Sequence, residues 1–187
     1  MPEIEIRPAI SSDIPVLMAI DHRYSSDYVW QMEVDRVEEG QVNGCKEHSV
    51  HFRQVRLPRS VRVEYPRTPR HLRESWTQRD GVLVACLAGE PIGYISLMLN
   101  LTPLRTAWAT DLAVKRRLGR QGIGSALVLA AQEWGIGQGC RYLILEMQPK
   151  NYAAIHLAQK LGFDFCGYND RYYANHDIGL FFAKALY

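Results

Sequence analysis

Short stretches of the chain alternate between apolar and polar residues, which is the period-two pattern of half-buried β-strands. Residues 28–35 and 50–65 are expected to pair as an excursion from the main sheet, around a polar loop at 37–46 and with a break at Leu57-Pro58-Arg59. Residues 141–148 carry a near-continuous apolar run, which favours a central strand. The predicted strands span residues 3–7, 28–35, 50–65, 81–87, 91–99, 108–114, 141–148, 163–168 and 178–186.

Three further segments predict helices, over residues 14–23, 122–134 and 151–161. The first follows Ser11-Ser12-Asp13, because Ser or Asp can cap a helix and Pro15 is tolerated in its first turn. The second carries an apolar stripe, and the glycines at 135, 137 and 139 are expected to end it. Strands and helices together predict a mixed α/β domain whose first half is antiparallel.

Length and charge narrow the class of protein. A chain of 187 residues can form one domain with a sizeable core. The net charge of +2 gives little reason to expect nucleic acid or a membrane as partner. No apolar run is long enough to span a bilayer, and the N-terminus lacks a secretory pattern, so a cytoplasmic location is expected. The oligomeric state stays open, with a homodimer as one option.

The cysteines and histidines are scattered along the chain, so no metal site is predicted. The four cysteines lack zinc spacing, and we interpret them as small buried apolar residues. They are Cys45, Cys86, Cys140 and Cys166.

Arginine is concentrated in one region, with eight between residues 53 and 79. Because Glu64, Glu74 and Asp80 interrupt this run, a solvated strand and helix face is our interpretation. The alternative is a rim that attracts an acidic substrate or the phosphates of a cofactor. The arginines are Arg53, Arg56, Arg59, Arg62, Arg67, Arg70, Arg73 and Arg79.

The strongest chemical signal is the turn after the strand at 108–114. Gly122 and Gly124 let a ligand approach the backbone, and the first N–H groups of the helix that begins there have no carbonyl partner. Such groups bind phosphate oxygens, and charge-assisted bonds of this kind contribute roughly 1.5–3 kcal/mol each. The arginines at 116, 117 and 120 add positive charge. The turn therefore predicts a pyrophosphate site; the alternative is a tight turn whose glycines serve packing.

This segment resembles motif A of the GNAT superfamily of N-acetyltransferases. The motif reads Gln/Arg-x-x-Gly-x-Gly/Ala and follows a strand that ends in an apolar-Ala-Val triplet. Leu112-Ala113-Val114 and Arg120-Gln121-Gly122-Ile123-Gly124 match it. Gly119 departs from it, since the family usually has Gln or Arg there. The departure weakens a side-chain contact but leaves the backbone N–H groups in place.

Residues 145–163 resemble motif B of the same family, with a strand, Asn151, an Ala-rich helix and Leu161-Gly162-Phe163. Ile6-Arg7-Pro8-Ala9 and the hairpin at 89–95 also resemble the family. The resemblance covers most of the chain except about residues 25–75, which we interpret as a variable excursion on the acceptor side. It implies one N-acetyltransferase domain over 1–187, with a mixed sheet of about seven strands, splayed centrally and flanked by helices.

The resemblance also implies acetyl-CoA as co-substrate. Its pantetheine arm is expected between the splayed strands, because an amide-bearing arm can satisfy strand N–H and C=O groups that have no protein partner. Asn151 is expected to bond it through its side chain. The residues expected to bind acetyl-CoA are Leu112, Ala113, Val114, Gly119, Arg120, Gln121, Gly122, Ile123, Gly124, Ser125, Asn151 and Ala154.

Acetyl transfer to an amine needs a base, a donor to the developing oxyanion and an acid for the leaving thiolate. Glu146 and Asp111 are candidate bases, and Glu146 matches the position of the base in the ribosomal-protein N-terminal acetyltransferases of this superfamily. A structural carboxylate is the alternative for each. The oxyanion donor is expected to be a backbone N–H near Val114. The usual acid, a Tyr seven residues after the motif Asn, is replaced by Ala158, so Tyr173 is the candidate acid, with packing as the alternative.

The acceptor is indicated only by a weaker resemblance. Residues 145–148 and 167–182 are similar to the streptothricin acetyltransferase group, which implies a small polyamine-like acceptor. We expect direct attack of the acceptor amine in a ternary complex, because no Cys in either motif is placed as a nucleophile. The alternatives are an acetyltransferase for a protein N-terminus or lysine, and a non-catalytic acyl-CoA sensor, suggested by Ala158 and Gly119. A Rossmann enzyme is disfavoured, because the glycine-rich turn follows several antiparallel strands.

Overall fold

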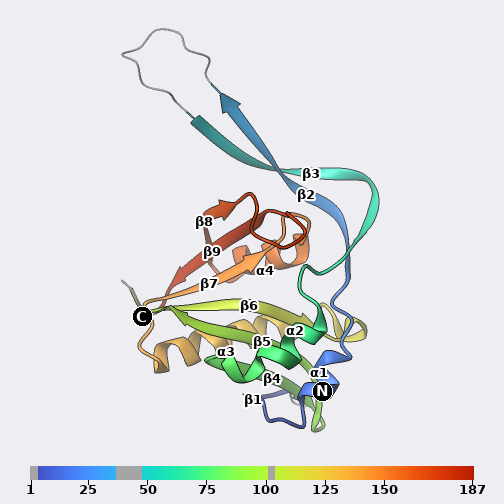
Figure 1. Ribbon diagram of the computed structural model, residues 1–187, viewed down its shortest axis with the longest axis vertical. Coiled ribbons are helices and arrows are strands. Elements are labelled where there is room, and N and C mark those ends of the chain that lie inside the picture. Colours follow the sequence, from blue (N-terminus) through green and yellow to red (C-terminus); the bar gives the residue numbers. More distant parts are fainter. Residues whose placement is uncertain (1–3, 37–47, 101–103) are drawn as a thin grey trace.

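A computed structural model describes residues 4–36, 48–100 and 104–187 (Figure 1). In these ranges, seven strands form the main sheet in the order β1-β4-β5-β6-β7-β9-β8, and two form a separate hairpin, β2-β3. The strands are β1 (Ile4–Pro8), β2 (Tyr24–Arg36), β3 (His48–Val63), β4 (Gly81–Leu87), β5 (Glu90–Asn100), β6 (Thr106–Val114), β7 (Tyr142–Met147), β8 (Asp164–Asn169) and β9 (Gly179–Ala185). The helices are α1 (Ile14–Met18), α2 (Pro69–Ser75), α3 (Ile123–Gly137) and α4 (Tyr152–Lys160), with 3₁₀ turns at Trp76–Gln78 and Arg116–Leu118.

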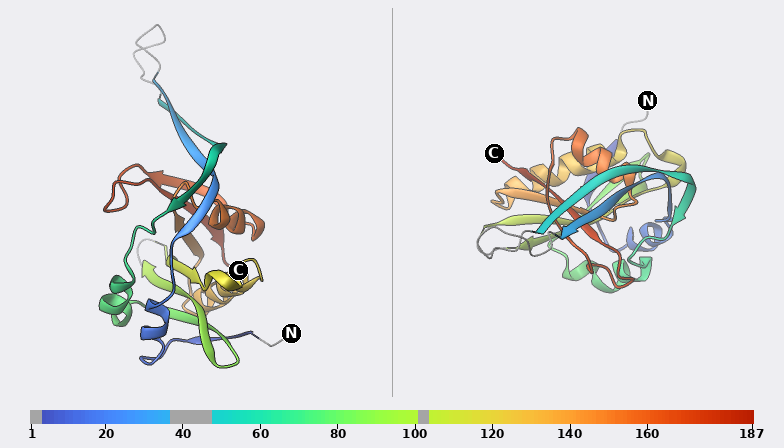
Figure 2. Two further views of the ribbon diagram at one scale, coloured as in Figure 1. Left: turned by 90° about the vertical axis from the view of Figure 1, so that its right-hand side faces the viewer. Right: turned by 90° about the horizontal axis from the view of Figure 1, so that it is seen from above.

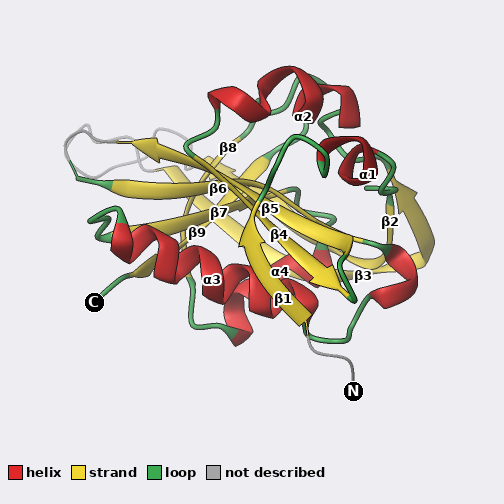
Figure 3. Ribbon diagram, turned by 90° about the horizontal axis from the view of Figure 1, so that it is seen from below, coloured by secondary structure: helices red, strands yellow, loops and turns green. Residues whose placement is uncertain are grey.

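Helices cover both faces of the main sheet, α3 and α4 on one and α1 and α2 on the other (Figure 3). Each pair encloses a core of its own: Leu127 of α3 and Leu143 of β7 belong to one, Leu17 of α1 and Tyr94 of β5 to the other. Neighbouring strands from β1 to β6 are antiparallel, and β6 and β7 are parallel. The mixed α/β class and the antiparallel first half are therefore confirmed. None of the described helices is long and apolar enough to cross a membrane.

Two helix ends differ from the sequence prediction. Helix α3 continues through Gly135, because the missing side chain there accommodates Leu186; a Cβ atom would lie 3.0 Å from Leu186 Cδ1. Helix α1 ends at Met18 instead of near Arg23. Residues 21–23 instead line a cleft described below, and His22 Nε2 lies 3.0 Å from the Tyr94 hydroxyl. Tertiary contacts override the local signal at both ends.

The predicted excursion is confirmed as the β2-β3 hairpin, which projects from the main sheet (Figures 1 and 2). The expected break at 57–59 is instead a register shift, opposite Ser26 and Tyr28, within a continuous β3. The loop predicted at 37–46 lies outside the described residues. The base of the hairpin is attached to the motif B region: Trp30 N donates to Pro149 O at 2.9 Å, and the Tyr28 ring lies 4.7 Å from that of Tyr152.

The interpretation of the cysteines is confirmed for two of them. Cys86 and Cys140 are buried in the two cores. Cys166 contradicts it, because its side chain is exposed on β8, an edge strand whose residues are mostly exposed. Cys45 lies outside the described residues.

The Asp13 carboxylate is expected to stabilise the fold at neutral pH and to lose this effect in acid. It accepts hydrogen bonds from both terminal nitrogens of Arg7, at 2.7 and 2.9 Å, and from Ile10 N at 2.9 Å. The bond to Arg7 is the main reason why the pKa of Asp13 lies below its ordinary value. We expect Asp13→Asn to lower the free energy of unfolding by about 2 kcal/mol at pH 7.

The pH dependence follows from the sign of that shift. A lowered folded-state pKa gives stabilisation that is complete above the unfolded value of about 3.9 and is lost as the pH falls through the lowered pKa. Urea unfolding at pH 7 and pH 2.5 should therefore show a difference between the wild type and Asp13→Asn that shrinks at the lower pH. A difference independent of pH would contradict the ion pair as its source. Asp21→Asn, in an exposed pair with Arg23, is the matched control.

Candidate active site

The central strands separate part-way along the sheet. β6 and β7 pair only through Thr106–Ala109 and Tyr142–Leu145. Beyond that point β6 stays with β5 up to Val114, and β7 stays with β9 up to Met147. The β6 edge from Asp111 to Val114 therefore has no partner among the described strands on its β7 side, and the N–H and C=O groups that face that side are available to a ligand. The predicted splay is confirmed.

A β-bulge lies at the start of this separation. Ser96 of β5 is opposite Asp111, whereas its neighbour Leu97 is opposite Ala109, so Thr110 is an extra residue in β6. A bulge bends its strand and changes the direction of the side chains around it. The bulge therefore sets both the departure of β6 from β7 and the position of Asp111.

A cleft of about 600 Å³ extends from the open edge of β6 to the N-terminal ends of α3 and α4. Residues 21–25, at the base of the hairpin, form part of its wall. Gln121 alone among the twelve residues expected to bind acetyl-CoA does not line it. The eleven that do are Leu112, Ala113, Val114, Gly119, Arg120, Gly122, Ile123, Gly124, Ser125, Asn151 and Ala154.

The turn before α3 has the backbone geometry of an anion cradle. Gly122 is the N-cap of α3 with φ +85°, and Arg120 has φ +61°, an uncommon value for a residue with a side chain. The bond from Ala126 N to Gly122 O closes the first turn of the helix, so the preceding N–H groups have no helical acceptor. These groups and the side chains of Arg116 and Arg120 lie at the cleft.

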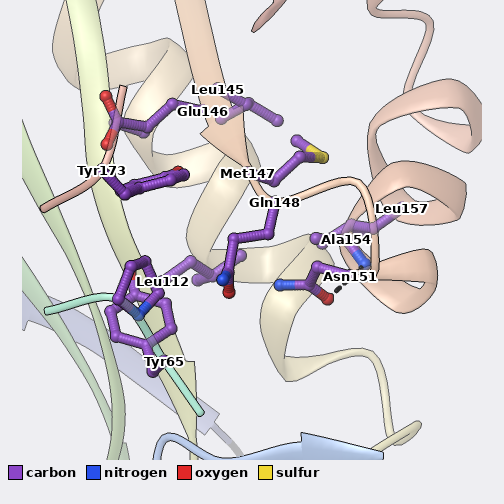
Figure 4. Close-up of a pocket in the computed structure, with 12 residues that line it drawn as sticks. Tyr65, Leu112, Leu145, Glu146, Met147, Gln148, Asn151, Ala154, Leu157 and Tyr173 are labelled. Atoms are coloured by element: carbon purple, nitrogen blue, oxygen red, sulfur yellow. Dashed lines mark hydrogen bonds between the residues drawn. The ribbon is translucent and has the colours of Figure 1, made fainter. Parts of the chain in front are cut away.

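A narrow cavity of about 50 Å³ adjoins the cleft between β6 and β7 (Figure 4). Leu112, Asn151 and Ala154 line both spaces. The Asn151 side-chain oxygen caps α4 by accepting from Ala154 N at 3.2 Å, and its amide nitrogen points toward Gln148 and the cavity (Figure 4). Glu146 and Tyr173 also line the cavity. Two candidate catalytic residues thus line one space next to the predicted co-substrate cleft.

The Glu146 side chain is fully buried, with 0% exposed, and donors occupy both carboxylate oxygens. Oε1 accepts from the Arg67 guanidinium. Oε2 accepts from Trp108 Nε1 at 2.5 Å and from the Tyr172 hydroxyl. The three donors come from separate parts of the chain, so the carboxylate is held by contacts that only the tertiary structure provides.

Asp111 is also buried, but it does not line the narrow cavity. Its Oδ1 accepts from the Tyr65 hydroxyl at 2.9 Å, and its Oδ2 accepts from Thr110 Oγ1 at 3.0 Å. Arg67 and Arg79 approach it at 3.6 and 3.7 Å. This geometry favours the structural interpretation of Asp111, as an anchor for two arginines at the bulge.

The two arginines correct the interpretation of residues 53–79 as a solvated face. Arg79 is only 7% exposed, and Arg67 Nη1 donates to Thr110 O at 2.6 Å. The solvated interpretation is right for Arg53 and Arg70, which form exposed pairs with glutamates. Arg67, like Tyr65 and Trp108, is a site residue that the sequence reasoning missed, because no motif or spacing distinguishes it from its neighbours.

Tyr173 lies beside Glu146 at the cavity (Figure 4). Its ring is 7% exposed, and the Arg67 guanidinium carbon lies 5.5 Å from the ring centroid. Burial is the main cause that raises the pKa of Tyr173, with the Glu146 charge second, so the phenol stays protonated at neutral pH. Ala158, at the position of the usual acid, is fully buried within the core.

The close packing of Gly93 against β6 leaves no room for a larger side chain at this position. A Cβ atom at Gly93 would lie 2.8 Å from Ala113 O and 3.1 Å from Val114 Cγ2, so β6 would have to shift. We expect Gly93→Ala to lower the free energy of unfolding by about 1–3 kcal/mol, the usual cost of overpacking. Gly137→Ala is the control, because its Cβ would meet nothing within 4 Å. Equal unfolding midpoints for the two variants in urea would contradict this packing argument.

The comparisons with known proteins identify the family. The family model of the acetyltransferase (GNAT) family matches residues 50–163, so the chain belongs to that family of acyltransferases, whose co-substrate is acetyl-CoA. No curated protein sequence matches the chain.

Solved structures share the fold at low sequence identity. Nourseothricin acetyltransferase aligns with a TM-score of 0.79 and 20% identity, over 98% of this chain and 99% of that one. A protein described as a streptothricin acetyltransferase, from Bacillus anthracis and in complex with acetyl coenzyme A, aligns with a TM-score of 0.71 and 20% identity, over the same shares of the two chains. A ribosomal-protein alanine N-acetyltransferase from Escherichia coli aligns with a TM-score of 0.66 and 18% identity, over 98% of this chain and 94% of that one. At these identities the likeness concerns the fold alone.

Proposed function

We propose that the chain transfers the acetyl group of acetyl-CoA to a primary amine of a small, polyamine-like acceptor. The observation that carries this proposal is the position of Glu146 and Tyr173 in one narrow cavity, which adjoins the cleft lined by the predicted acetyl-CoA residues. The narrowness of that cavity favours a small amine. The fold shared with two antibiotic acetyltransferases supports the same acceptor class.

We further propose how the cleft holds acetyl-CoA. The N–H groups at the start of α3 and the side chains of Arg116 and Arg120 suit the pyrophosphate, because a helix N-terminus and guanidinium groups both favour anions. The open backbone edge at residues 112–114 suits the amides of the pantetheine arm. Asn151, with its amide nitrogen toward the cavity, suits a carbonyl of that arm. The thioester supplies the electrophilic carbonyl carbon.

The proposed reaction is direct attack. The acceptor ammonium gives one proton to Glu146, and the resulting amine attacks the thioester carbonyl carbon; the C–N bond forms, the C–S bond breaks, and the second proton on nitrogen passes to the Tyr173 phenolate that is left once the sulfur is protonated. A backbone N–H near Val114 stabilises the developing oxyanion. Tyr173 gives its proton to the leaving sulfur, a role that its protonated phenol allows. Asp111 supports the site through the arginines that it holds.

Two other functions compete with this one. Acetylation of a protein N-terminus or lysine is favoured by the fold shared with the ribosomal-protein alanine N-acetyltransferase. A non-catalytic acyl-CoA sensor is favoured by the buried Ala158 and by the donors on both oxygens of Glu146. A peptide acceptor requires an open approach, whereas a sensor binds acetyl-CoA without turnover.

Thiol release from acetyl-CoA, measured over a panel of polyamines, aminated antibiotics and peptides, separates the three functions. Turnover on polyamines or antibiotics supports the proposal, turnover on peptides alone supports the protein acetyltransferase, and binding of acetyl-CoA without turnover supports the sensor. An acetylated enzyme trapped in the absence of acceptor would contradict direct attack.

Tyr173→Phe tests the proposed acid. We expect turnover to fall by about 10²-fold, at the lower end for general acid catalysis, while the affinity for acetyl-CoA stays unchanged. Tyr168→Phe is the control, because that tyrosine is exposed on β8. A turnover in Tyr173→Phe equal to that of the wild type would assign Tyr173 to packing.

A further inference from the structure

The guanidinium of Arg67 lies between the two carboxylates that the sequence singles out as candidate bases. It donates to Glu146 Oε1 and lies 3.6 Å from Asp111 Oδ1. It also donates to Thr110 O at 2.6 Å and lies over the ring of Tyr173. These partners are two anions, a carbonyl oxygen and an aromatic face, which is a set that binds an ammonium ion as well as a guanidinium.

The charges at this point balance only while Arg67 is present. Glu146 and Asp111 contribute two negative charges, and Arg67 and Arg79 contribute two positive ones. If the Arg67 side chain leaves, one negative charge stays uncompensated at buried carboxylates, which is unfavourable. A cation that enters the same position restores the balance. The two carboxylates therefore favour a positively charged group at this position. Removing that group without a replacement costs free energy.

The main chain around Arg67 is irregular, and its side chain is partly exposed. Arg67 lies in residues 64–68, between the end of β3 and the start of α2, a segment that forms neither helix nor strand. Its side chain is 21% exposed, whereas that of Arg79 is 7% exposed and is also held by Thr110 Oγ1 at 3.0 Å. Of the two arginines at Asp111, Arg67 is therefore the one with a route to solvent.

We propose that Arg67 occupies the ammonium subsite of the acceptor and is displaced by the acceptor when it binds. This inference rests on the proposed function and adds a specificity-determining residue to it. An acceptor amine enters protonated, replaces the guanidinium at Glu146 and so meets the base directly. Arg67 thereby keeps Glu146 paired in the absence of acceptor and selects for acceptors that carry a cation at the reacting end.

Competition between a bound cation and Arg67 can be measured without turnover. We would follow the thermal unfolding of the wild type, Arg67→Ala, Arg67→Lys and the matched control Arg79→Gln against spermidine and methylguanidinium chloride, at constant ionic strength. We expect Arg67→Ala to respond to spermidine at an about tenfold lower concentration than the wild type, the equivalent of one charged hydrogen bond released. Arg67→Lys and Arg79→Gln, which keep a tethered cation at Glu146, should respond as the wild type does.

Methylguanidinium should stabilise Arg67→Ala but not the wild type, because it replaces the missing group. The proposal is overturned if spermidine acts at one concentration on both proteins, if Arg79→Gln shows the same gain, or if methylguanidinium leaves Arg67→Ala unchanged. Arg67→Gln, which keeps a donor for Thr110 O, takes the place of Arg67→Ala should the latter fail to fold. Failure of the proposed function is seen separately, as absent thiol release from a protein that still shows this competition.

Discussion

Glu146→Gln is expected to lower the turnover of acetyl transfer by about 10²- to 10³-fold, within the range that general base catalysis contributes. The amide keeps the size of the side chain but cannot accept the proton of the attacking amine. Binding of acetyl-CoA should persist, because Glu146 does not line the cleft that holds the predicted co-substrate residues. Steady-state kinetics with a responsive acceptor, together with calorimetric binding of acetyl-CoA, checks both parts.

The control is Glu133→Gln, at an exposed position of α3, which should match the wild type. The amide also removes the charge that pairs with Arg67, so unfolding curves are needed to show that the variant is folded at the assay temperature. If folded Glu146→Gln turns over within a few-fold of the wild type, Glu146 is not the base. It would leave Glu146 as a structural carboxylate held by Arg67, Trp108 and Tyr172.

Asp111→Asn is expected to lower the free energy of unfolding by about 3 kcal/mol, the scale for removing one partner of a buried ion pair. The loss arises because Arg79, only 7% exposed, keeps its charge without the carboxylate that compensates it. Arg67 loses the weaker of its two ionic contacts at the same time. Urea unfolding at pH 7 measures the change.

A second substitution tests that explanation. In Asp111→Asn with Arg79→Met, both charges are absent, so the double variant should lose clearly less stability than the sum of the two single losses. Additive losses would show that the cost comes from another source, such as the hydrogen bond from Tyr65 or the packing of the bulge. The affinity for acetyl-CoA is a second measurement, because the bulge positions the β6 edge that borders the predicted acetyl-CoA cleft.

The sequence determined the parts of the site that are contiguous in the chain. Residues 112–125 and 151–154 hold all twelve of the predicted acetyl-CoA residues, and eleven of the twelve line one cleft. This works because a strand end, a glycine with φ +85° and a helix start are backbone features encoded within a few residues. The succession of strands along the chain and the hairpin excursion follow from equally local patterns.

The tertiary structure decided what surrounds the candidate bases. Arg67, Trp108 and Tyr172 meet at Glu146 from segments 79, 38 and 26 residues away along the chain. Eight arginines occur between residues 53 and 79 at similar spacing. No local pattern indicates that Arg67 and Arg79 are the two that contact buried carboxylates. A β-bulge at Thr110 and the path of the chain after β3 bring these charges together, and the free energy of pairing buried ions depends on that assembly and not on neighbours in sequence.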